Sequence, residues 1–349
     1  MNHLRKKVDP PLAPAPPPFE RRAVASALNP VQTVVIDESS DGQRLDNLLI
    51  RLLKGVPRSH LQQLIRSGQV RVNGGRTKSM HKLALGDKVR VPPVRVTAVT
   101  QRRVRPSEFP IVFEDDGLLV IDKPDGVAVH GGSGVSSGVI ERLRAARPEQ
   151  SFLELVHRID RDTSGLLMLA KKRAVLLQLQ AQLRERITAK SYLAIVKGLW
   201  PRRTKTLRGA LLKTRNASGE RIVREDEDGQ DAVTHVTGLR HANLPALGSF
   251  SLVRCAIETG RTHQIRVHLA QAGFPIIGDQ KYGDFELNKL LGKRTFKRMY
   301  LHAFSLEVHH PNAIDKLQLN AVMPAAFELF LIAGEAAPQL GGGLLEHRF

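Results

Sequence analysis

The sequence predicts an α+β fold in two unequal domains, the larger of which contains a mixed, mainly antiparallel sheet flanked by helices and loops. The 349 residues, 42% of them apolar, can bury more than one core. A short basic segment near the start shows apolar residues at helical spacing, and runs typical of strands and helices follow from Phe109 onward. These later elements do not alternate as regular βαβ units, which argues against a parallel, doubly wound sheet.

Three stretches show no helical or strand period. Residues 1–30 are rich in proline, alanine and arginine, so we expect a disordered tail there. Residues 97–106 are expected to be a linker between the domains, and residues 336–349 a second tail. The domains themselves are then predicted at 31–96 and 107–335.

The composition favours a cytoplasmic protein. No run reaches the roughly 18 continuous apolar residues that a membrane helix needs, and prolines and charges at the start exclude a signal peptide. Cys255 is the only cysteine, which excludes an intrachain disulfide and a cysteine-based zinc cluster.

The smaller domain, residues 31–96, is predicted to begin with two short helices. We expect Ser59 to cap the second helix and Gly68 to end it in the left-handed conformation. Alternating apolar residues and the turn signal that follows them predict short strands near residues 70–72 and 85–92. The apolar positions of the first helix form one stripe, made of Leu45, Leu48, Leu49, Leu52 and Leu53.

Positive charge is concentrated in this smaller domain. The whole chain carries +19, and residues 31–105 hold 15 Lys and Arg against five Asp and Glu, a net charge of +10. A solvated surface is the ordinary explanation for one charge run, but this concentration in a compact unit favours a polyanion: RNA, DNA or an acidic membrane. With one Trp and three Tyr in the chain, we expect contacts mostly to phosphates. The side chains expected to make them are Arg44, Lys54, Arg58, Arg66 and Arg71.

The larger domain, residues 107–335, begins with a strand predicted at 118–121, after a turn at Asp116 and Gly117. Two further strands, LLMLAKK and SYLAIVKG, are separated by the helical spacing of AVLLQLQAQLRERI. Near the end, GRTHQIRVHLAQAG predicts a helix that stops at Gly273.

A charged turn between apolar flanks is the first candidate site. Residues 157–164, HRIDRDTS, follow one predicted strand and precede another, so their side chains are held at the edge of a sheet. A loop whose Arg and Asp residues pair with one another is the alternative explanation.

This turn resembles the signature of the RluA-type pseudouridine synthase family. HRIDRDTSG at 157–165 carries the resemblance, and three further blocks agree in order: KPDGVAVHGG at 123–132, KSYLAIVKG at 190–198 and TGRTHQIRVHL at 259–269. The smaller domain, with RLDNLL, RSGQV, VRVNG and GDKVRV, resembles the alpha-L RNA-binding domain. Together these segments cover about residues 35–330.

The resemblance implies an RNA isomerase that works without a metal or an organic cofactor. Its substrate would be large-subunit ribosomal RNA, and we expect the protein to be a monomer. Asp160 would be the catalytic carboxylate, Tyr192 the active-site tyrosine, and Arg266 the partner of Asp160.

Three more side chains are expected to touch RNA. Arg158 would fill the gap left by an everted base, and His157 would contact the RNA beside it. His130 either helps to hold the RNA or simply caps a glycine turn, and both alternatives stay open.

The chemistry fits these residue types. Breaking an N-glycosidic bond builds positive character at the anomeric carbon, and an ionised carboxylate can stabilise it, add to it or remove a sugar proton. Burial would raise the pKa of Asp160, so an ion pair with Arg266 is expected to keep it charged. Tyr192 would lie against the base, although a core tyrosine in a strand is the plain alternative.

Other functions are less well supported by the sequence. His263 and His268 are five apart and turn away from each other on a helix, which disfavours a metal site. A non-catalytic RNA-binding assembly factor would not need to retain Asp160, Tyr192 and Arg266 together. A base-excising RNA glycosylase would need a second carboxylate to activate water, and none is evident.

Overall fold

A computed structural model describes residues 27–38, 40–53, 55–96, 104–131, 137–216, 219–311 and 315–335. The chain divides into two compact units, Met1–Gln101 and Arg102–Phe349, and the division falls inside the stretch predicted as a linker. Lys54, the predicted tail at 336–349 and residues 1–26 of the other predicted tail lie outside the described residues.

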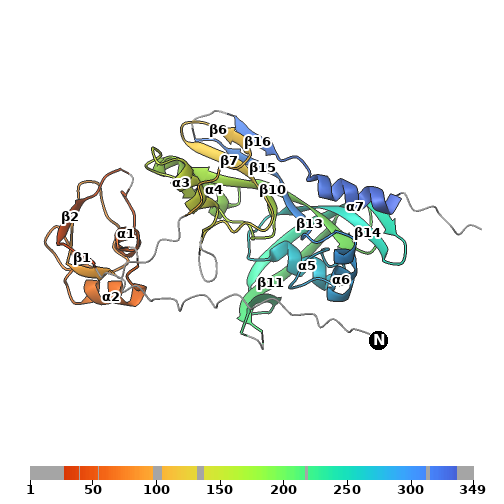
Figure 1. Cartoon of the computed structure of the whole chain (residues 1–349), viewed down its shortest axis with the longest axis horizontal. Coiled ribbons are helices and arrows are strands. Elements are labelled where there is room, and N and C mark those ends of the chain that lie inside the picture. The colour runs from red at the N-terminus through yellow and green to blue at the C-terminus, as the bar shows by residue number, and fades with distance from the viewer. Residues whose placement is uncertain are drawn as a thin grey trace, which may run out of the picture. The chain divides into compact units, whose positions relative to one another are not determined.

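The first unit contains two helices and two small sheets (Figure 1). The leucine stripe of the first helix and the apolar face of the second are buried in one core with three short strands, as the spacing predicts. The elements are β1 (Ala27–Asn29), β2 (Gln32–Val35), α1 (Leu45–Leu52), α2 (Arg58–Arg66), β3 (Arg71–Val72), β4 (Lys88–Val91) and β5 (Val94–Val96).

Two local expectations need correction. The backbone of β1 pairs antiparallel with that of β5, so residues 27–29 of the predicted tail are a strand. The partner strand lies more than 60 residues away along the chain, and no local pattern reveals it. Ser59 lies inside α2 rather than at its cap, because Pro57 occupies the N-cap and its fixed φ leads directly into the helix. Gly68 has the expected positive φ.

The second unit is built on one 11-stranded sheet with the path β12-β11-β13-β14-β10-β15-β9-β7-β6 (Figure 1). Two more strands, β16 and β8, pair with β15 and β9 respectively. The strands are β6 (Ile111–Glu114), β7 (Leu118–Lys123), β8 (Glu154–Leu155), β9 (Ser164–Ala170), β10 (Ala189–Lys197), β11 (Lys205–Arg215), β12 (Arg221–Glu225), β13 (Gln230–Leu244), β14 (Gly248–Ile257), β15 (Leu301–His309) and β16 (Lys316–Asn320).

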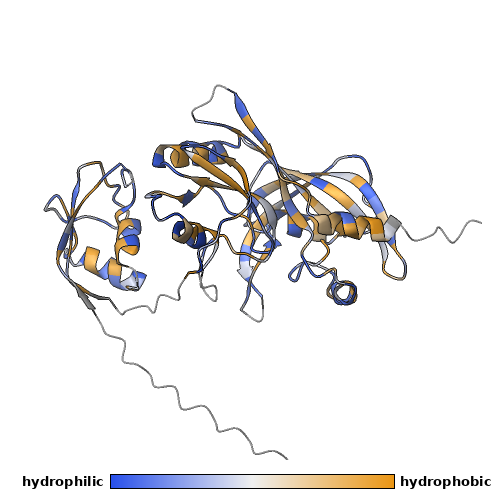
Figure 2. Cartoon of the chain, turned by 45° about the horizontal axis from the view of Figure 1, so that its top comes forward, coloured by the Kyte–Doolittle hydropathy of each residue, from blue (hydrophilic) through white to orange (hydrophobic). Residues whose placement is uncertain are grey.

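Helices cover this sheet, and hydrophobic residues run along its strands and along the last helix (Figure 2). Helix α3 (Val139–Ala146) packs beside β7, and α4 (Arg173–Glu185) contacts β9 and β15. Helix α5 (Gln264–Gln271) contacts β11, β12 and β13, and α7 (Ala325–Glu335) contacts β13. Helix α6 (Phe285–Lys293) lies between α5 and α7 in the sequence. Among the described residues, no helix is both long enough and apolar enough to cross a membrane.

The sheet is mixed and mainly antiparallel, which confirms the predicted fold class. Every pairing is antiparallel except the short parallel contact of β9 with β15, where Ser164 lies beside His302 and Gly165 beside Ala303. This contact joins the two halves of the sheet at the exit of the charged turn 157–164. The candidate site therefore lies at this β9–β15 contact, the seam between the two halves of the sheet.

Gly165 permits the close approach at this seam. Its φ is +108°, and a Cβ at this position would lie 2.6 Å from the Ala303 backbone nitrogen, with the Ala303 carbonyl closer still. Both the conformation and the space thus require glycine.

We expect Gly165→Ala to lower the free energy of unfolding by about 3 kcal/mol, since it adds backbone strain to a clash with a neighbouring strand. Gly248→Ala is the matched control, because Gly248 has φ +97° but no atom within 4 Å of the added Cβ. That control is expected to lose only about 1 kcal/mol. Equal losses in denaturant titrations of the two variants would show that the strand contact is not the cause.

Candidate active site

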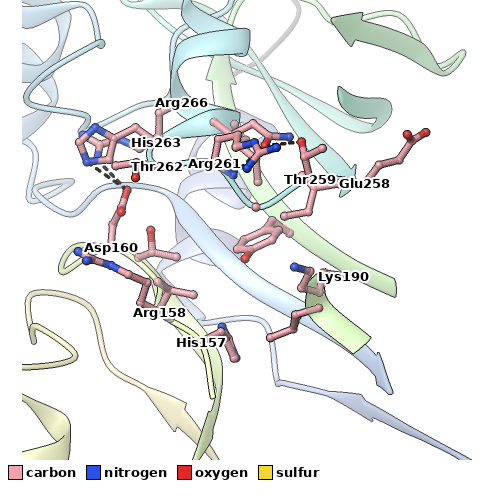
Figure 3. Close-up of a pocket in the computed structure, with 18 of the residues that line it drawn as sticks. His157, Arg158, Asp160, Lys190, Glu258, Thr259, Arg261, Thr262, His263 and Arg266 are labelled. Atoms are coloured by element: carbon pink, nitrogen blue, oxygen red, sulfur yellow. Dashed lines mark hydrogen bonds and ion pairs between the residues drawn. The ribbon is translucent and has the colours of Figure 1, made fainter. Parts of the chain in front are cut away.

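A pocket of about 500 Å³ opens in the second unit where the charged turn meets the loop before α5 (Figure 3). The turn contributes residues 157–160 and Thr163, the end of α4 and the start of β10 form one wall, and residues 257–266 form another. Three of the four blocks of the family resemblance, 157–165, 190–198 and 259–269, contribute residues to this lining, and the block 123–132 does not.

Lys123 holds the charged turn in place through hydrogen bonds to backbone carbonyls. Its ammonium group is fully buried and donates to the backbone carbonyls of Pro124, Val127 and Arg161 at 2.7, 2.8 and 2.9 Å. Burial lowers the pKa of Lys123 to about 8, and the charges of Asp125, Asp162 and Asp160 oppose this shift. Lys123 therefore joins the KPDG segment to the residue that follows Asp160.

His157 also has a structural contact. Its Nε2 accepts a hydrogen bond from the Met168 backbone N–H at 3.1 Å, which ties the start of the turn to β9. Burial of the ring, with the charge of Lys190 nearby, lowers the pKa of His157 to about 3, so the ring is neutral at pH 7. The hydrogen bond from Met168 gives His157 a structural role in the turn. The contact expected between His157 and RNA stays a prediction.

Asp160 and Arg266 form the ion pair that the resemblance implies. Arg266 Nη1 lies 2.9 Å from Asp160 Oδ2, and the Asp160 side chain is 24% exposed to the pocket. The other oxygen of this carboxylate, Oδ1, has no hydrogen-bond partner in the described part of the chain.

A second carboxylate, that of Asp279, fixes the orientation of the Arg266 guanidinium. Arg266 Nε and Nη2 donate to the two oxygens of Asp279, both at 2.7 Å, and Asp279 also accepts the backbone N–H groups of Lys281 and Tyr282. Burial alone would lower the pKa of Arg266, but the hydrogen bonds and charges of Asp279 and Asp160 outweigh it and raise the pKa. Arg266 is therefore a permanent, rigidly held cation.

His263 is a further neighbour of Asp160 (Figure 3). Its Nε2 lies 3.8 Å from Asp160 Oδ2, while its Nδ1 is 2.7 Å from the hydroxyl of Tyr282. Tyr282 in turn has the Arg266 guanidinium over its ring, at 5.1 Å from the centroid.

Tyr192 lines the same pocket from β10, opposite Cys255 of β14. Burial, and the charge of Asp160, raise the pKa of its hydroxyl, so the group stays protonated. Lys190, two residues earlier on the same face of the strand, lines the pocket as well and has no ion-pair partner among the described residues.

The remaining predicted residues fall in three places. Arg158 is exposed at the pocket and unpaired within the described part of the chain, whereas His130 is exposed and not among the residues lining the pocket. In the first unit, Arg44 makes a bidentate pair with Asp46, and the exposed Arg58 also pairs with Asp46, at 3.4 Å. Within the described residues, Arg66 and Arg71 donate only to backbone carbonyls.

Sequence reasoning missed four site residues: Lys123, His263, Asp279 and Tyr282. Lys123 and His263 stand inside blocks of the resemblance, but nothing in their spacing indicates their contacts. Asp279 and Tyr282 belong to GDQKYGD, which has the composition of an ordinary turn. Among the described residues, no cluster of three or more His, Cys, Asp or Glu side chains is placed to hold a metal ion.

Comparisons with known proteins agree with this geometry. A family model described as RNA pseudouridylate synthase matches residues 117–271, and the S4 domain model matches residues 43–89. Ribosomal large subunit pseudouridine synthase C of Haemophilus influenzae is 48% identical over 299 residues, which span 83% of this chain and 91% of that protein. The Escherichia coli K12 protein of the same name is 47% identical over 302 residues, 84% of this chain and 93% of its own.

Among solved structures, human RNA pseudouridylate synthase domain containing 4 is 27% identical with a TM-score of 0.52, covering 65% of this chain and 93% of that one. These matches confirm the two families predicted from the sequence and their order along the chain.

We expect His157→Gln to make the protein less sensitive to acid. The folded pKa of about 3 lies below the ordinary 6.5, so the neutral ring contributes stability that is complete above pH 6.5 and is lost as the pH falls toward 3. Glutamine keeps an acceptor for the Met168 N–H but cannot take up a proton.

Between about pH 7.5 and 5, the variant should lose about 2 kcal/mol less unfolding free energy than the wild type, measured by urea titration. His309→Gln, which changes an exposed histidine, is the control. If both variants follow the wild type, His157 does not carry the acid sensitivity.

Proposed function

The chain belongs to the RNA pseudouridylate synthase family of isomerases, and from that premise we propose that it converts specific uridines of large-subunit ribosomal RNA to pseudouridine, with Asp160 as the catalytic carboxylate. The observation that carries this proposal is the asymmetric hold on Asp160. The printed contacts of Arg266 and His263 both reach its Oδ2, at 2.9 and 3.8 Å, and Oδ1 has no hydrogen-bond partner in the described part of the chain.

The reaction moves one bond of the base. The bond between C1′ and N1 breaks, the uracil turns, C5 bonds to C1′, and C5 loses a proton while N1 gains one. No oxidant, reductant or metal is needed for this balance. Asp160 can attack C1′, add to C6 or remove the 2′ proton, and each of these steps requires an ionised oxygen facing the nucleoside.

Arg266 supports that ionised state. A carboxylate in a partly dry pocket tends to protonate, and an adjacent fixed cation opposes this. Asp279 holds Nε and Nη2 of Arg266, and Arg266 reaches Asp160 through Nη1, which fixes the direction from which the carboxylate is held.

The target base must leave its stack to reach the pocket. We assign Tyr192 as the aromatic wall beside the everted base, with its protonated hydroxyl available for the proton exchange at C5. The exposed, unpaired Arg158 is free to occupy the gap that the base leaves.

We expect basic side chains in both units to bind RNA phosphates. Cations without an ion-pair partner among the described residues line the pocket: Arg158, Arg184, Arg186 and Lys190. In the S4 domain, Arg66 and Arg71 present exposed guanidinium groups, while Arg44 and Arg58 are both partly occupied by Asp46. Such a substrate places the protein in the cytoplasm.

The glycosylase alternative needs a second carboxylate to activate water. Glu258 is the other carboxylate among the described residues that line the pocket, and its Oε1 lies 2.7 Å from His235 Nε2. Asp279 is 1% exposed and occupied by Arg266, and Asp162 pairs with Arg161, so we assign this role to neither of them.

We expect Asp160→Asn to abolish pseudouridine formation, with a decrease of at least about 1000-fold, because the amide cannot supply the charge. Ribosomal RNA from cells lacking the gene, complemented by each version, is treated with carbodiimide and read by primer extension. Asp162→Asn is the matched control, since it removes an exposed carboxylate of the same turn. Stops that return with Asp160→Asn would refute the assignment.

Arg266→Lys is expected to lower the turnover rate about 100-fold while RNA affinity stays near that of the wild type. Lysine keeps the charge but cannot bridge Asp279 and Asp160 at once, so the carboxylate moves away from its productive position. Single-turnover rates and filter binding measure the two quantities. Arg240→Lys, at an arginine that pairs with Glu328 away from the pocket lining, serves as control. A normal turnover rate in Arg266→Lys would contradict the positioning role.

A further inference from the structure

His263 stands between Asp160 and Tyr282, and neither the family signature nor the charge pattern assigns it a task. Its side chain is 15% exposed and bridges the two groups, with Nδ1 at 2.7 Å from the Tyr282 hydroxyl and Nε2 at 3.8 Å from Asp160 Oδ2. Figure 3 shows the ring directed toward Asp160.

The backbone fixes the ring in this place. His263 is the N-cap of α5 with φ 55° and ψ 17°, a left-handed conformation that is uncommon for a residue with a side chain. Its carbonyl accepts the Val267 N–H at 3.0 Å, so the ring is anchored to the same helix that carries Arg266.

The hydrogen bonds around Tyr282 determine which nitrogen of His263 carries the proton. The Tyr282 oxygen accepts the backbone N–H of Val223 at 2.8 Å, so its own hydrogen is directed to the other near neighbour, His263 Nδ1. Nδ1 is then an acceptor, and in a neutral imidazole the hydrogen must lie on Nε2, which faces Asp160.

The neutral form is also the one favoured by the surroundings. Burial lowers the pKa of His263, the cations Arg266 and Lys281 act in the same direction, and the charges of Asp160 and Asp279 oppose them without prevailing. The hydrogen bonds that run from Val223 through Tyr282 to His263 are therefore consistent with a neutral His263 that carries its hydrogen on Nε2.

The chain begins in the β11–β12 hairpin. Val223 lies in β12 and packs with Leu211, Val267 and Tyr282 in one small core, and Glu220 of the hairpin pairs with Lys281. The position of this hairpin is thereby linked, through one hydroxyl and one imidazole, to the catalytic carboxylate.

Resting on the proposed function, we propose that His263 is a positioning residue: its Nε2–H, directed by Tyr282, is the second donor to Asp160 Oδ2 and keeps Oδ1 facing the nucleoside. The 3.8 Å separation closes to a hydrogen bond when substrate fills the pocket, because catalytic hydrogen bonds are often long before the substrate binds.

The test is a double-mutant cycle. Tyr282→Phe removes the hydroxyl but keeps the ring under Arg266, and His263→Asn removes the imidazole while tolerating the left-handed backbone. Each variant should lower kcat about tenfold, with KM and RNA affinity near those of the wild type, since one hydrogen bond to a charged group is lost.

The double variant should be no slower than His263→Asn, because the hydroxyl acts only through the imidazole. Losses that multiply would overturn the proposal, as would single variants with normal kcat. His263→Gln, whose terminal amide can reach Asp160, should keep more of kcat than His263→Asn, and it also serves if the shorter variant fails to fold. A merely structural role predicts no such rescue.

Two further arms separate the possible failures. Tyr300→Phe removes a hydroxyl from a tyrosine that does not line the pocket, and it should behave as the wild type. If the wild type itself forms no pseudouridine, or Asp160→Asn is fully active, the proposed function fails. If those arms behave as expected and the cycle is additive, only the role of His263 is refuted.

Discussion

The buried guanidinium of Arg266 is the constraint on which the site depends. It lies between two carboxylates, Asp279 and Asp160, with only 6% of its side chain exposed. A buried cation is costly unless its hydrogen bonds are satisfied, and removing one partner of such a group leaves an unpaired charge in a dry environment. Since Asp279 satisfies the Nε edge and is itself satisfied by two backbone amides, the arginine cannot turn away from Asp160. The carboxylate that we propose to be catalytic is thus positioned by a hydrogen-bonded network that extends to the buried Asp279.

The fold delivers these groups from opposite halves of one sheet. Asp160 precedes β9, and Arg266 lies on α5, which packs on β11, β12 and β13. The halves meet where β9 runs parallel to β15, and the contact needs Gly165. Within the half that carries β7 and β9, Lys123 ties the KPDG segment to the charged turn through its three carbonyl partners. The parallel contact, which is the exception in an otherwise antiparallel sheet, is therefore what brings the turn to the pocket.

Local patterns predicted the parts of the structure that local physics controls. The leucine stripe of α1 and the strand β7 follow from residue spacing, and so does α5, which is followed by Gly273 with positive φ but begins at Gln264, later than the predicted segment GRTHQIRVHLAQAG. The pairing of Asp160 with Arg266 was expected only from the family resemblance, because 106 residues separate them. Asp279, Tyr282 and β1 could not be predicted, since each is defined by a partner distant in the sequence. The hydrogen bond from the Met168 backbone N–H to the ring nitrogen of His157 could not be predicted from the sequence either, and the RNA contact expected of His157 stays a prediction.

The charges around Asp160 explain how the carboxylate that we propose to be catalytic can lie in a surface proposed to bind phosphates. An isolated Asp would repel the RNA backbone over roughly a Debye length, about 8 Å at physiological salt. Around Asp160 the pocket is lined by Arg158, Arg184, Arg186 and Lys190, none of which is neutralised within the described part of the chain. Arg266 offsets the carboxylate locally without covering Oδ1. In the proposed function, RNA phosphates would therefore meet these cations while the nucleoside would meet the carboxylate, so the arrangement of charges that attracts RNA also leaves Oδ1 without a hydrogen-bond partner in the described part of the chain.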